Sequence, residues 1–430
     1  MAVISPTIST SSSDVNVLWR KVQGDLADGM NFLSEEWAMM EAFVPKKYQI
    51  DVSAREITVP IDLTEDYGVA DIPEGGYEAR TSSPNPLEIT LGYQLMNARF
   101  SASVTARILD EKHRGAELRR QIVYQGMKKM QALAAHWSNA VYGTSTGVLA
   151  VTDTNLTAGP DTMTLKNLFE DTNLPGTTTA QGTYIANLLK VGDIVAAIKT
   201  SSLVASAIGA VTAIASQSSP TITVTWELGS PSDTTDGLKI VKANSTEGTT
   251  IAATSFNRGL VGWQDVLKST TVHGLSGSTY PNWTTASADT AGGRLTAVRL
   301  RKLRDEVANK GPRKADRVIW SQGVARDVID LERAALRYDD PFGLELDGEV
   351  KAKGLNFFTS RRVLPGHCIV YDSQSYRRLD VMPKPDGTFA WGDAHKMENR
   401  SGYLFPIDFI AGMVCLARKG TAYASGLTEQ

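Results

Sequence analysis

Residues 101–142 read SASVTARILDEKHRGAELRRQIVYQGMKKMQALAAHWSNAVY, and this stretch decides the fold that the sequence predicts. From Val104 to Val141 the apolar residues recur near the helical period, and Arg, Lys and Glu occupy the other side. Gly143 follows as a natural C-cap. At 1.5 Å per residue, one continuous helix here would run on the order of 60 Å. The stretch therefore predicts a long spine helix, to which we assign residues 101–145.

Upstream of this helix the chain changes to an extended pattern. Ile57, Val59 and Ile61 alternate with polar neighbours, as is typical of a strand. Because proline cannot donate to a sheet ladder, a proline-rich ribbon is expected to project from the body of the protein. We therefore assign residues 48–100 to a long hairpin loop and residues 1–47 to an N-terminal arm with short helices. The prolines of the ribbon are Pro60, Pro73, Pro84 and Pro86.

Downstream of the helix, charged residues become sparse and Ser, Thr, Ala and Gly dominate. Short alternating runs at residues 191–198 and 221–226 predict strands. This segment lies between two parts of different composition, as an inserted domain does when its ends are close together. Residues 146–255 are therefore predicted to be an inserted all-β unit, a small barrel or sandwich that folds autonomously.

The remaining residues, 256–430, have a mixed pattern of helices and strands. Thr296 is placed to cap a helix that ends at the Lys-Gly-Pro sequence of residues 310–312. A strand is predicted at residues 317–320, and a second helix carries apolar residues from Val324 to Ala335. Several strand-like segments follow. We expect an α+β arrangement in which helices lie on one mostly antiparallel sheet.

The composition excludes several classes of function. The chain has 430 residues, with 44 Lys and Arg against 47 Asp and Glu, and a net charge of −3 disfavours a dedicated nucleic-acid binder. Cys368 and Cys415 are too few for a disulfide framework or a thiolate metal site, and we expect both to be buried. The five histidines lack the spacing of a metal site, so no metal and no cofactor is expected.

Neither export nor membrane insertion is expected. Residues 1–14 are polar and lack the apolar stretch of a secretory signal. The least charged stretch, residues 203–215, is shorter than the roughly 20 apolar residues that a membrane span requires. We therefore expect a soluble protein inside a cell.

Motifs that could carry catalysis are weak, and we predict that the protein is not an enzyme. Residues 143–147, GTSTG, match the pattern of a hydrolase nucleophile elbow around Ser145, but that elbow needs a strand before the serine and a helix after it. Here a predicted helix comes first, so a loop that ends the helix is the better interpretation. Asp339 and Asp340 are interpreted as turn formers rather than a calcium site. The Arg pairs at 361–362 and 377–378 are interpreted as charged surface, and Tyr280, Trp263 and Trp283 as packing residues.

Several blocks of sequence resemble one family of proteins. Two blocks resemble the central part of tailed-bacteriophage major capsid proteins with the Hong-Kong-97-type (HK97-like) fold. These blocks are GLVG at residues 259–262 and TVHGLSGSTYPNW at residues 271–283. Three further blocks are similar to later stretches of that family and occur in the same order. They are SQGVAR at residues 321–326, VKAKGL at residues 350–355 and RRVLPGH at residues 361–367. The turn IPEGG at 72–76 is similar to one in the extended loop of the family. The resemblance spans most of residues 48–416.

The resemblance implies a fold for each part of the chain. Residues 1–47 would be the N-terminal arm, residues 48–100 the extended loop, and residues 101–145 the spine helix of the peripheral domain. Residues 256–430 would form the axial domain and the remaining strands of the peripheral domain. The β unit at residues 146–255 departs from the minimal pattern and resembles the insertion domain that some members carry.

The resemblance also implies a function. The protein would self-assemble as hexamers and pentamers into the icosahedral shell of a virion, which encloses double-stranded DNA without sequence-specific binding. Assembly would take place in the host cytoplasm, and a portal protein would be a partner, along with separate scaffolding and decoration proteins. The alternatives are the shell of a bacterial, encapsulin-like cargo compartment of the same fold, and an unrelated enzyme or adhesin. Subunit contacts are expected on the extended loop at Arg55, Glu65, Asp66, Glu74 and Arg80.

Overall fold

The computed structural model describes most of the chain. The described residues are 42–47, 57–61, 63, 87–103, 116–152, 160–166, 168–170, 182, 184–186, 188–198, 205–215, 219–229, 231, 238–243, 260–336, 354–380, 390–391, 393, 395–396 and 402–429.

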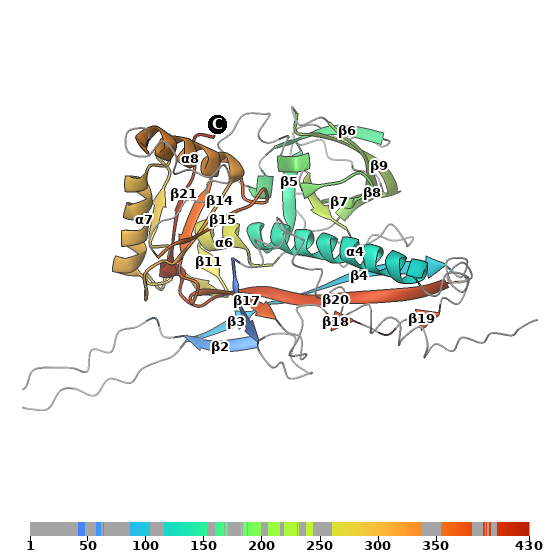
Figure 1. The fold of residues 1–430 in the computed structure, drawn as a ribbon, viewed down its shortest axis with the longest axis horizontal. Coiled ribbons are helices and arrows are strands. Elements are labelled where there is room, and N and C mark those ends of the chain that lie inside the picture. The colour runs from blue at the N-terminus through green and yellow to red at the C-terminus, as the bar shows by residue number, and fades with distance from the viewer. Residues whose placement is uncertain are drawn as a thin grey trace, which may run out of the picture.

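One long strand organises the first sheet. Strand β20 (Gly402–Cys415) pairs along ten consecutive positions with antiparallel β4 (Gln94–Ser103), from Gly402 opposite Ser103 to Ala411 opposite Gln94. Its other edge pairs in turn with β17 (Tyr376–Asp380), β18 (Ala390–Trp391) and β19 (His395–Lys396). Strand β1 (Val44–Lys47) completes the sheet in parallel with β17. Helix α4 (Ala116–Tyr142) lies along β4 and β20 (Figure 1).

The prediction of a single helix over residues 101–142 is wrong at its start. Residues 101–103 end strand β4, residues 104–115 lie outside the described residues, and helix α4 begins at Ala116. The physical reason is a period-2 pattern just upstream, in which Met96 and Phe100 are buried while Asn97 and Arg99 are exposed. The alternation continues to Ser101, which is exposed. Residues 101–103 are therefore strand, because they pair with β20 in the same ladder as the rest of β4.

The Ser- and Thr-rich segment forms a closed β-barrel. Its strands are β5 (Val148–Thr152), β6 (Pro160–Lys166), β7 (Ile194–Ile198), β8 (Ala205–Ile214), β9 (Thr221–Gly229) and β10 (Lys239–Lys242). They close in the order β10-β5-β6-β9-β8-β7, and a short helix η2 (Leu168–Glu170) follows β6. The predicted strands at 191–198 and 221–226 correspond to β7 and β9.

The second sheet has five strands and two covering helices. Its order is β13 (Ser287–Asp289), β21 (Thr421–Ala424), β16 (Cys368–Tyr371), β14 (Arg317–Trp320) and β15 (Asn356–Thr359). Helices α7 (Ala297–Lys310) and α8 (Gln322–Leu336) lie beside it (Figure 1). The Thr296 hydroxyl accepts a hydrogen bond from the Arg299 backbone N–H at 3.3 Å, so the predicted cap of α7 is confirmed.

The prediction of one mostly antiparallel sheet after residue 256 is wrong. Strands β17 and β20 belong to the first sheet, and in the second sheet β13 is parallel to β21 and β14 is parallel to β15. The reason is topological, because α8 crosses over between β14 and β15 and returns the chain in the same direction. The protein is therefore α+β, but with two large sheets, two small two-stranded sheets and a barrel among the described residues.

Small elements connect these layers. Helix α6 (Trp263–Lys268) precedes the two-stranded sheet of β11 (Thr271–Val272) and β12 (Leu275–Ser276). Strands β2 (Ile57–Ile61) and β3 (Leu87–Leu91) form a separate hairpin sheet, and η3 (Arg418–Gly420) leads from β20 to β21. The Arg418 guanidinium donates to the Val266, Ser269 and Trp283 carbonyls, which ties the end of β20 to α6 and its following loop.

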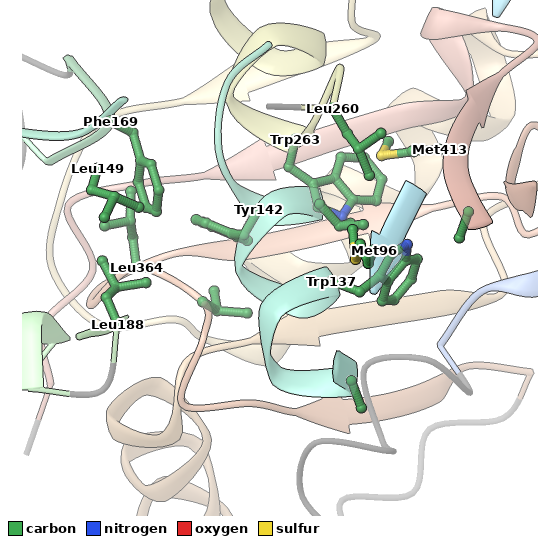
Figure 2. Close-up of a cluster of buried hydrophobic side chains, with 14 of the residues drawn as sticks. Met96, Trp137, Tyr142, Leu149, Phe169, Leu188, Leu260, Trp263, Leu364 and Met413 are labelled. Carbon is green, nitrogen blue, oxygen red and sulfur yellow. The ribbon is translucent and has the colours of Figure 1, made fainter. Parts of the chain in front are cut away.

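A cluster of aromatic side chains joins these layers. Trp263 stacks on Tyr376 with ring centroids 4.8 Å apart, and Phe43 meets the edge of Trp137 at 5.7 Å. The same apolar cluster continues into the barrel region, where Figure 2 shows residues such as Phe169 beside Tyr142. One hydrophobic core therefore connects the barrel to the body of the protein.

The chain enters and leaves the barrel region at one point. A Cβ built on Gly262, just before α6, would lie 2.4 Å from the carbonyl oxygen of Gly143 and 2.5 Å from that of Val141, at the end of α4. Real Cβ atoms do not approach backbone oxygen this closely. Only glycine at 262 permits the two backbones to touch.

This contact predicts that Gly262→Ala destabilises the protein. We expect the free energy of unfolding to fall by about 3 kcal/mol, because backbone on both sides has to shift. Chemical denaturation of the subunit measures this change. Gly92→Ala is the matched control, since a Cβ there has no neighbour within 4 Å. An equal loss in both variants would contradict the explanation.

Candidate functional site

The root of the predicted extended loop is a two-stranded hairpin. Strand β2 pairs antiparallel with β3, with Ile57 opposite Leu91 and Ile61 opposite Leu87. Ile89 and Leu91 are buried against the body, whereas Glu88 and Thr90 on the other face of β3 are exposed. The alternation follows the period of a strand with one face on a core. The hairpin is thus firmly seated on the body at its root.

Two contacts hold this root. The Asn282 side chain donates to the Leu63 carbonyl at 2.9 Å, just beyond β2. His273 is buried at the turn between β11 and β12, with φ of 50°, and its ring lies beside the backbone of Thr90 on β3. Burial lowers the pKa of His273 to about 4, so the ring is neutral at pH 7. Both contacts come from the segment that carries the family-like block at residues 271–283.

The loop residues expected at subunit contacts cannot be placed. All five of them lie outside the described residues, namely Arg55, Glu65, Asp66, Glu74 and Arg80. Their role therefore stays a prediction.

A groove runs between the spine helix, the first sheet and the barrel. Its volume is about 790 Å³, which is within the range of pockets that enclose a ligand or a peptide segment. The lining residues come from β4 (residues 95–99), α4 (Lys129, Ala132, Leu133 and His136) and the end of β10 (Lys242 and Ala243).

The groove is lined by more polar than apolar surface, and three of its residues are cations. Leu95 is 60% exposed, on the face of β4 opposite to the buried Met96 and Phe100. Lys242 pairs with Asp193 at 3.1 Å. Arg99 donates to the Asn97 side chain at 3.0 Å, and neither Arg99 nor Lys129 has an ion pair among the residues that the structure describes. Within the described part of the chain, two cations therefore face this groove without an ion-pair partner.

His136 lies between this groove and a smaller pocket at the end of α4. The smaller pocket has a volume of about 40 Å³ and includes Asn139, Gly143 and Phe169. Burial, and secondly the charge of Lys242, lowers the pKa of His136 to about 4. A neutral imidazole on the wall leaves the positive charge of the groove to its Arg and Lys side chains.

The GTSTG motif has no catalytic geometry. It lies between the end of α4 at Tyr142 and the start of β5 at Val148, the reverse of the strand-then-helix order that a nucleophile elbow needs. The Ser145 backbone N–H donates to the Asp265 carboxylate at 2.6 Å. The loop therefore ends a helix and binds it to α6, as the sequence indicated.

The other motifs have structural roles. Trp263 and Trp283 are fully buried, and the Trp283 indole N–H donates to the Val272 carbonyl at 3.1 Å. The prediction of a charged surface at the Arg pairs is wrong for Arg362 and Arg378, which are buried. Arg362 is buried because its guanidinium binds Asn139 of α4 at 3.2 Å. Asp339 and Asp340 lie outside the described residues.

Over the ranges given above, the structure brings no three His, Cys, Asp or Glu side chains into a metal-binding group. Within the same ranges, no helix is both long and apolar enough to span a membrane. Both cysteines are unpaired and buried, as expected, and burial raises the pKa of each thiol to about 12.

The groove is the feature that sequence patterns missed. Its cations stand at positions 99, 129 and 242, and three different elements bring them together. The one local signal was Leu95, an apolar residue out of phase with the buried positions of β4.

Comparisons with known proteins give structural similarity at low sequence identity. No protein-family model and no curated protein sequence matches the chain. A chain of the cyanophage A-1(L) capsid is similar, with 10% identity, a TM-score of 0.49, and 91% of this chain and 92% of that chain covered. A capsid chain of the native GTA particle gives 10% identity, a TM-score of 0.43 and 91% coverage of both chains. A chain of the satellite phage P4 procapsid gives 8% identity, a TM-score of 0.40, and coverage of 99% of this chain and 93% of that chain.

The two neutral, buried histidines predict a pH dependence of stability. Their pKa values are about 4 in the folded protein and near 6.5 in an unfolded chain, so below pH 6.5 the unfolded state binds protons that the folded state does not. The free energy of unfolding should therefore fall as the pH drops from 6.5 towards 4, by up to about 1 kcal/mol per pH unit for each ring. Urea unfolding at a series of pH values measures this slope.

Replacing the two rings should flatten this slope. In the variant His136→Gln/His273→Gln, the free energy of unfolding should depend less on pH over the same interval. His395→Gln is the control, because His395 is exposed on β19. An unchanged slope in the double variant would show that other groups cause the pH dependence.

Proposed function

We propose that this protein is a major capsid protein with the Hong-Kong-97-type fold, and that it self-assembles into the icosahedral shell of a tailed bacteriophage. The observation that carries the proposal is the hairpin of β2 and β3. Its root is packed on the body, yet the 23 residues between Leu63 and Leu87 continue beyond it. At about 3.3 Å per residue they can reach roughly 35 Å out and back. A projection of that length suits contact with a neighbouring copy of the chain.

The parts of the fold suit the parts of such a subunit. Helix α4 and the β4–β20 sheet would form the peripheral domain, and the five-stranded sheet with α7 and α8 the axial domain. The barrel would be the inserted domain, because the close approach of Gly143 and Gly262 brings its entry and exit together. Residues 1–47 would be the N-terminal arm. The ordered sequence blocks between residues 259 and 367 support the same assignment.

In this role the chain is a structural protein of the virion rather than an enzyme. Hexamers and pentamers of identical subunits would enclose double-stranded DNA, after assembly in the host cytoplasm. A portal protein would occupy one vertex, and separate scaffolding or decoration proteins would bind the shell. The net charge of −3 supports enclosure of DNA without tight binding to it. A protein-cargo compartment of the same fold is not favoured.

The test is assembly of the purified protein. Expressed alone or with the neighbouring genes of its source, it should form closed particles in electron micrographs, with a sedimentation coefficient far above that of a 46.5 kDa monomer. Particles that contain DNA support the proposal, whereas particles filled with one protein cargo support the compartment. A protein that stays monomeric under all these conditions would contradict the proposal.

The extended loop gives a sharper prediction. Glu74→Lys should impair assembly while leaving the free energy of subunit unfolding unchanged within about 0.5 kcal/mol, because a charge matters at an interface only once it is desolvated and paired there. Light scattering follows assembly, and urea unfolding follows subunit stability. Asp305→Lys on α7 is a control on the body, since Asp305 is exposed. Normal assembly of Glu74→Lys would weaken the assignment of the loop.

A further inference from the structure

We infer that the outer face of α7 and the loop that follows it contact the phosphate backbone of duplex DNA. The inference rests on the proposed function, which supplies the DNA, and it assigns that contact to one surface of the subunit. Residues 294–314 contain eight Lys or Arg and two acidic residues, a net charge of +6, whereas the whole chain carries −3. This segment therefore has a strong local excess of positive charge.

The fold turns much of this charge outward. Leu300, Leu303 and Val307 are buried in the same apolar cluster as the strands of the five-stranded sheet. The exposed positions 298, 301, 302, 305 and 309 recur with the helical period on the opposite face. Figure 1 shows α7 at the outer edge of the molecule, with the sheet on its inner side. The exposed cations include Arg301 and Lys302 on the helix and Arg313 and Lys314 just after it.

These four cations take part in no ion pair within the described part of the chain. The ion pairs that α7 makes use other cations, since Lys310 pairs with Glu306 at 2.6 Å and Arg299 pairs with Asp289 at 2.9 Å. A solvated helix face usually carries charges of both signs in alternation. Here Asp305 is exposed among the cations, and the face still keeps a surplus of positive charge. That surplus is suited to an external anion.

The chemistry of this face favours nucleic acid over a protein partner. The centre of a stable protein–protein contact is apolar or aromatic. Apart from Ala297, Val298 and Pro312, the exposed positions from 296 to 314 are charged or polar, and none is aromatic. Duplex DNA needs no apolar centre, because contacts with phosphates supply essentially all of its non-specific binding.

The size and strength of such a contact suit the proposed function. The 14 residues of α7 span about 21 Å at 1.5 Å per residue, which matches roughly six base pairs of duplex. Non-specific contacts of this kind have dissociation constants on the order of 10⁻⁴ to 10⁻⁶ M at physiological salt. Binding this weak agrees with a chain whose net charge is −3, and it leaves DNA able to enter and leave a shell.

The first experiment measures how DNA binding depends on salt. A short labelled DNA duplex is titrated with the purified full-length chain at a series of salt concentrations, and fluorescence anisotropy gives the binding constant. Each lost phosphate contact lowers the slope of log K against log salt concentration by about 0.9. Arg301→Gln/Lys302→Gln and Arg313→Gln/Lys314→Gln should therefore each lower this slope by about 2, and the combined variant by about 4.

Lys128→Gln/Lys129→Gln is the matched control, because it removes two neighbouring exposed cations from another helix, α4. It should change the slope by less than the value of one phosphate contact. Urea unfolding of each variant checks that the fold is unchanged. An equal reduction of the slope in all three double variants would show that binding follows total charge, and it would overturn the inference.

The second experiment needs no variant. An amine-reactive reagent modifies exposed lysines, and mass spectrometry compares the rates in particles filled with DNA and in emptied particles. Lys302 and Lys314 should react several-fold more slowly in the filled particles. Lys190, which is exposed just before β7, should react at the same rate in both. Equal rates for Lys302 and Lys314 in the two kinds of particle would overturn the inference.

The outcomes separate this inference from the proposed function. If the unmodified protein forms no shells, the proposed function fails, whatever the slopes are. If it forms shells and the α7 variants keep the slope of the unmodified protein, only the inference fails. If those variants keep the slope but no longer assemble, the face contacts an acidic surface of a neighbouring copy, which also overturns the inference. Residues 330–349, with seven acidic and two basic residues, would be the candidate for that surface.

Discussion

The structure depends on the ladder between β4 and β20. Ten consecutive residue pairs hold the two strands, although residues 104–401 lie between them in the chain. The ladder gives α4 a long flat surface, and the side chains between the two layers include Met96, Trp137 and Phe409. Burying one large apolar side chain contributes about 1.5–3 kcal/mol. The helix therefore depends on the ladder, since helices in proteins draw most of their stability from such packing.

The same ladder fixes where the other units attach. The hairpin of β2 and β3 ends three residues before β4 begins, so its direction is set by the sheet. At the opposite end of α4, Gly143 touches Gly262, and this contact joins the barrel and α6 to the helix. Arg418, just after β20, holds three carbonyls of the α6 region. Each attachment lies within a few residues of the long helix or of the two long strands.

The sequence predicted those elements whose signals are local. Helix α7 was recognisable from Thr296 at its start and the Lys-Gly-Pro sequence at its end, and both signals act within one turn of the helix. The start of α4 was misplaced because residues near 101 fit a helical period while the strand pattern of β4 continues into them. Only the pairing with β20 decides between the two, and that partner lies far along the chain.

The candidate site was less predictable than the fold, for the same physical reason. The charged residues of the loop could be singled out, since an acidic and proline-rich ribbon has no core of its own. The groove could not, because Arg99, Lys129 and Lys242 become neighbours only after the barrel is closed against α4. The buried state of Arg362 also depends on a distant partner, Asn139.

The shared core of barrel and body has a mechanical consequence. An appended domain with its own core can tilt on its linkers, but Tyr142 and Phe169 pack across this junction with ring centroids 6.1 Å apart. Close-packed interiors have low compressibility and transmit strain. A force on the barrel surface is therefore transmitted to α4 through the side chains packed at this junction.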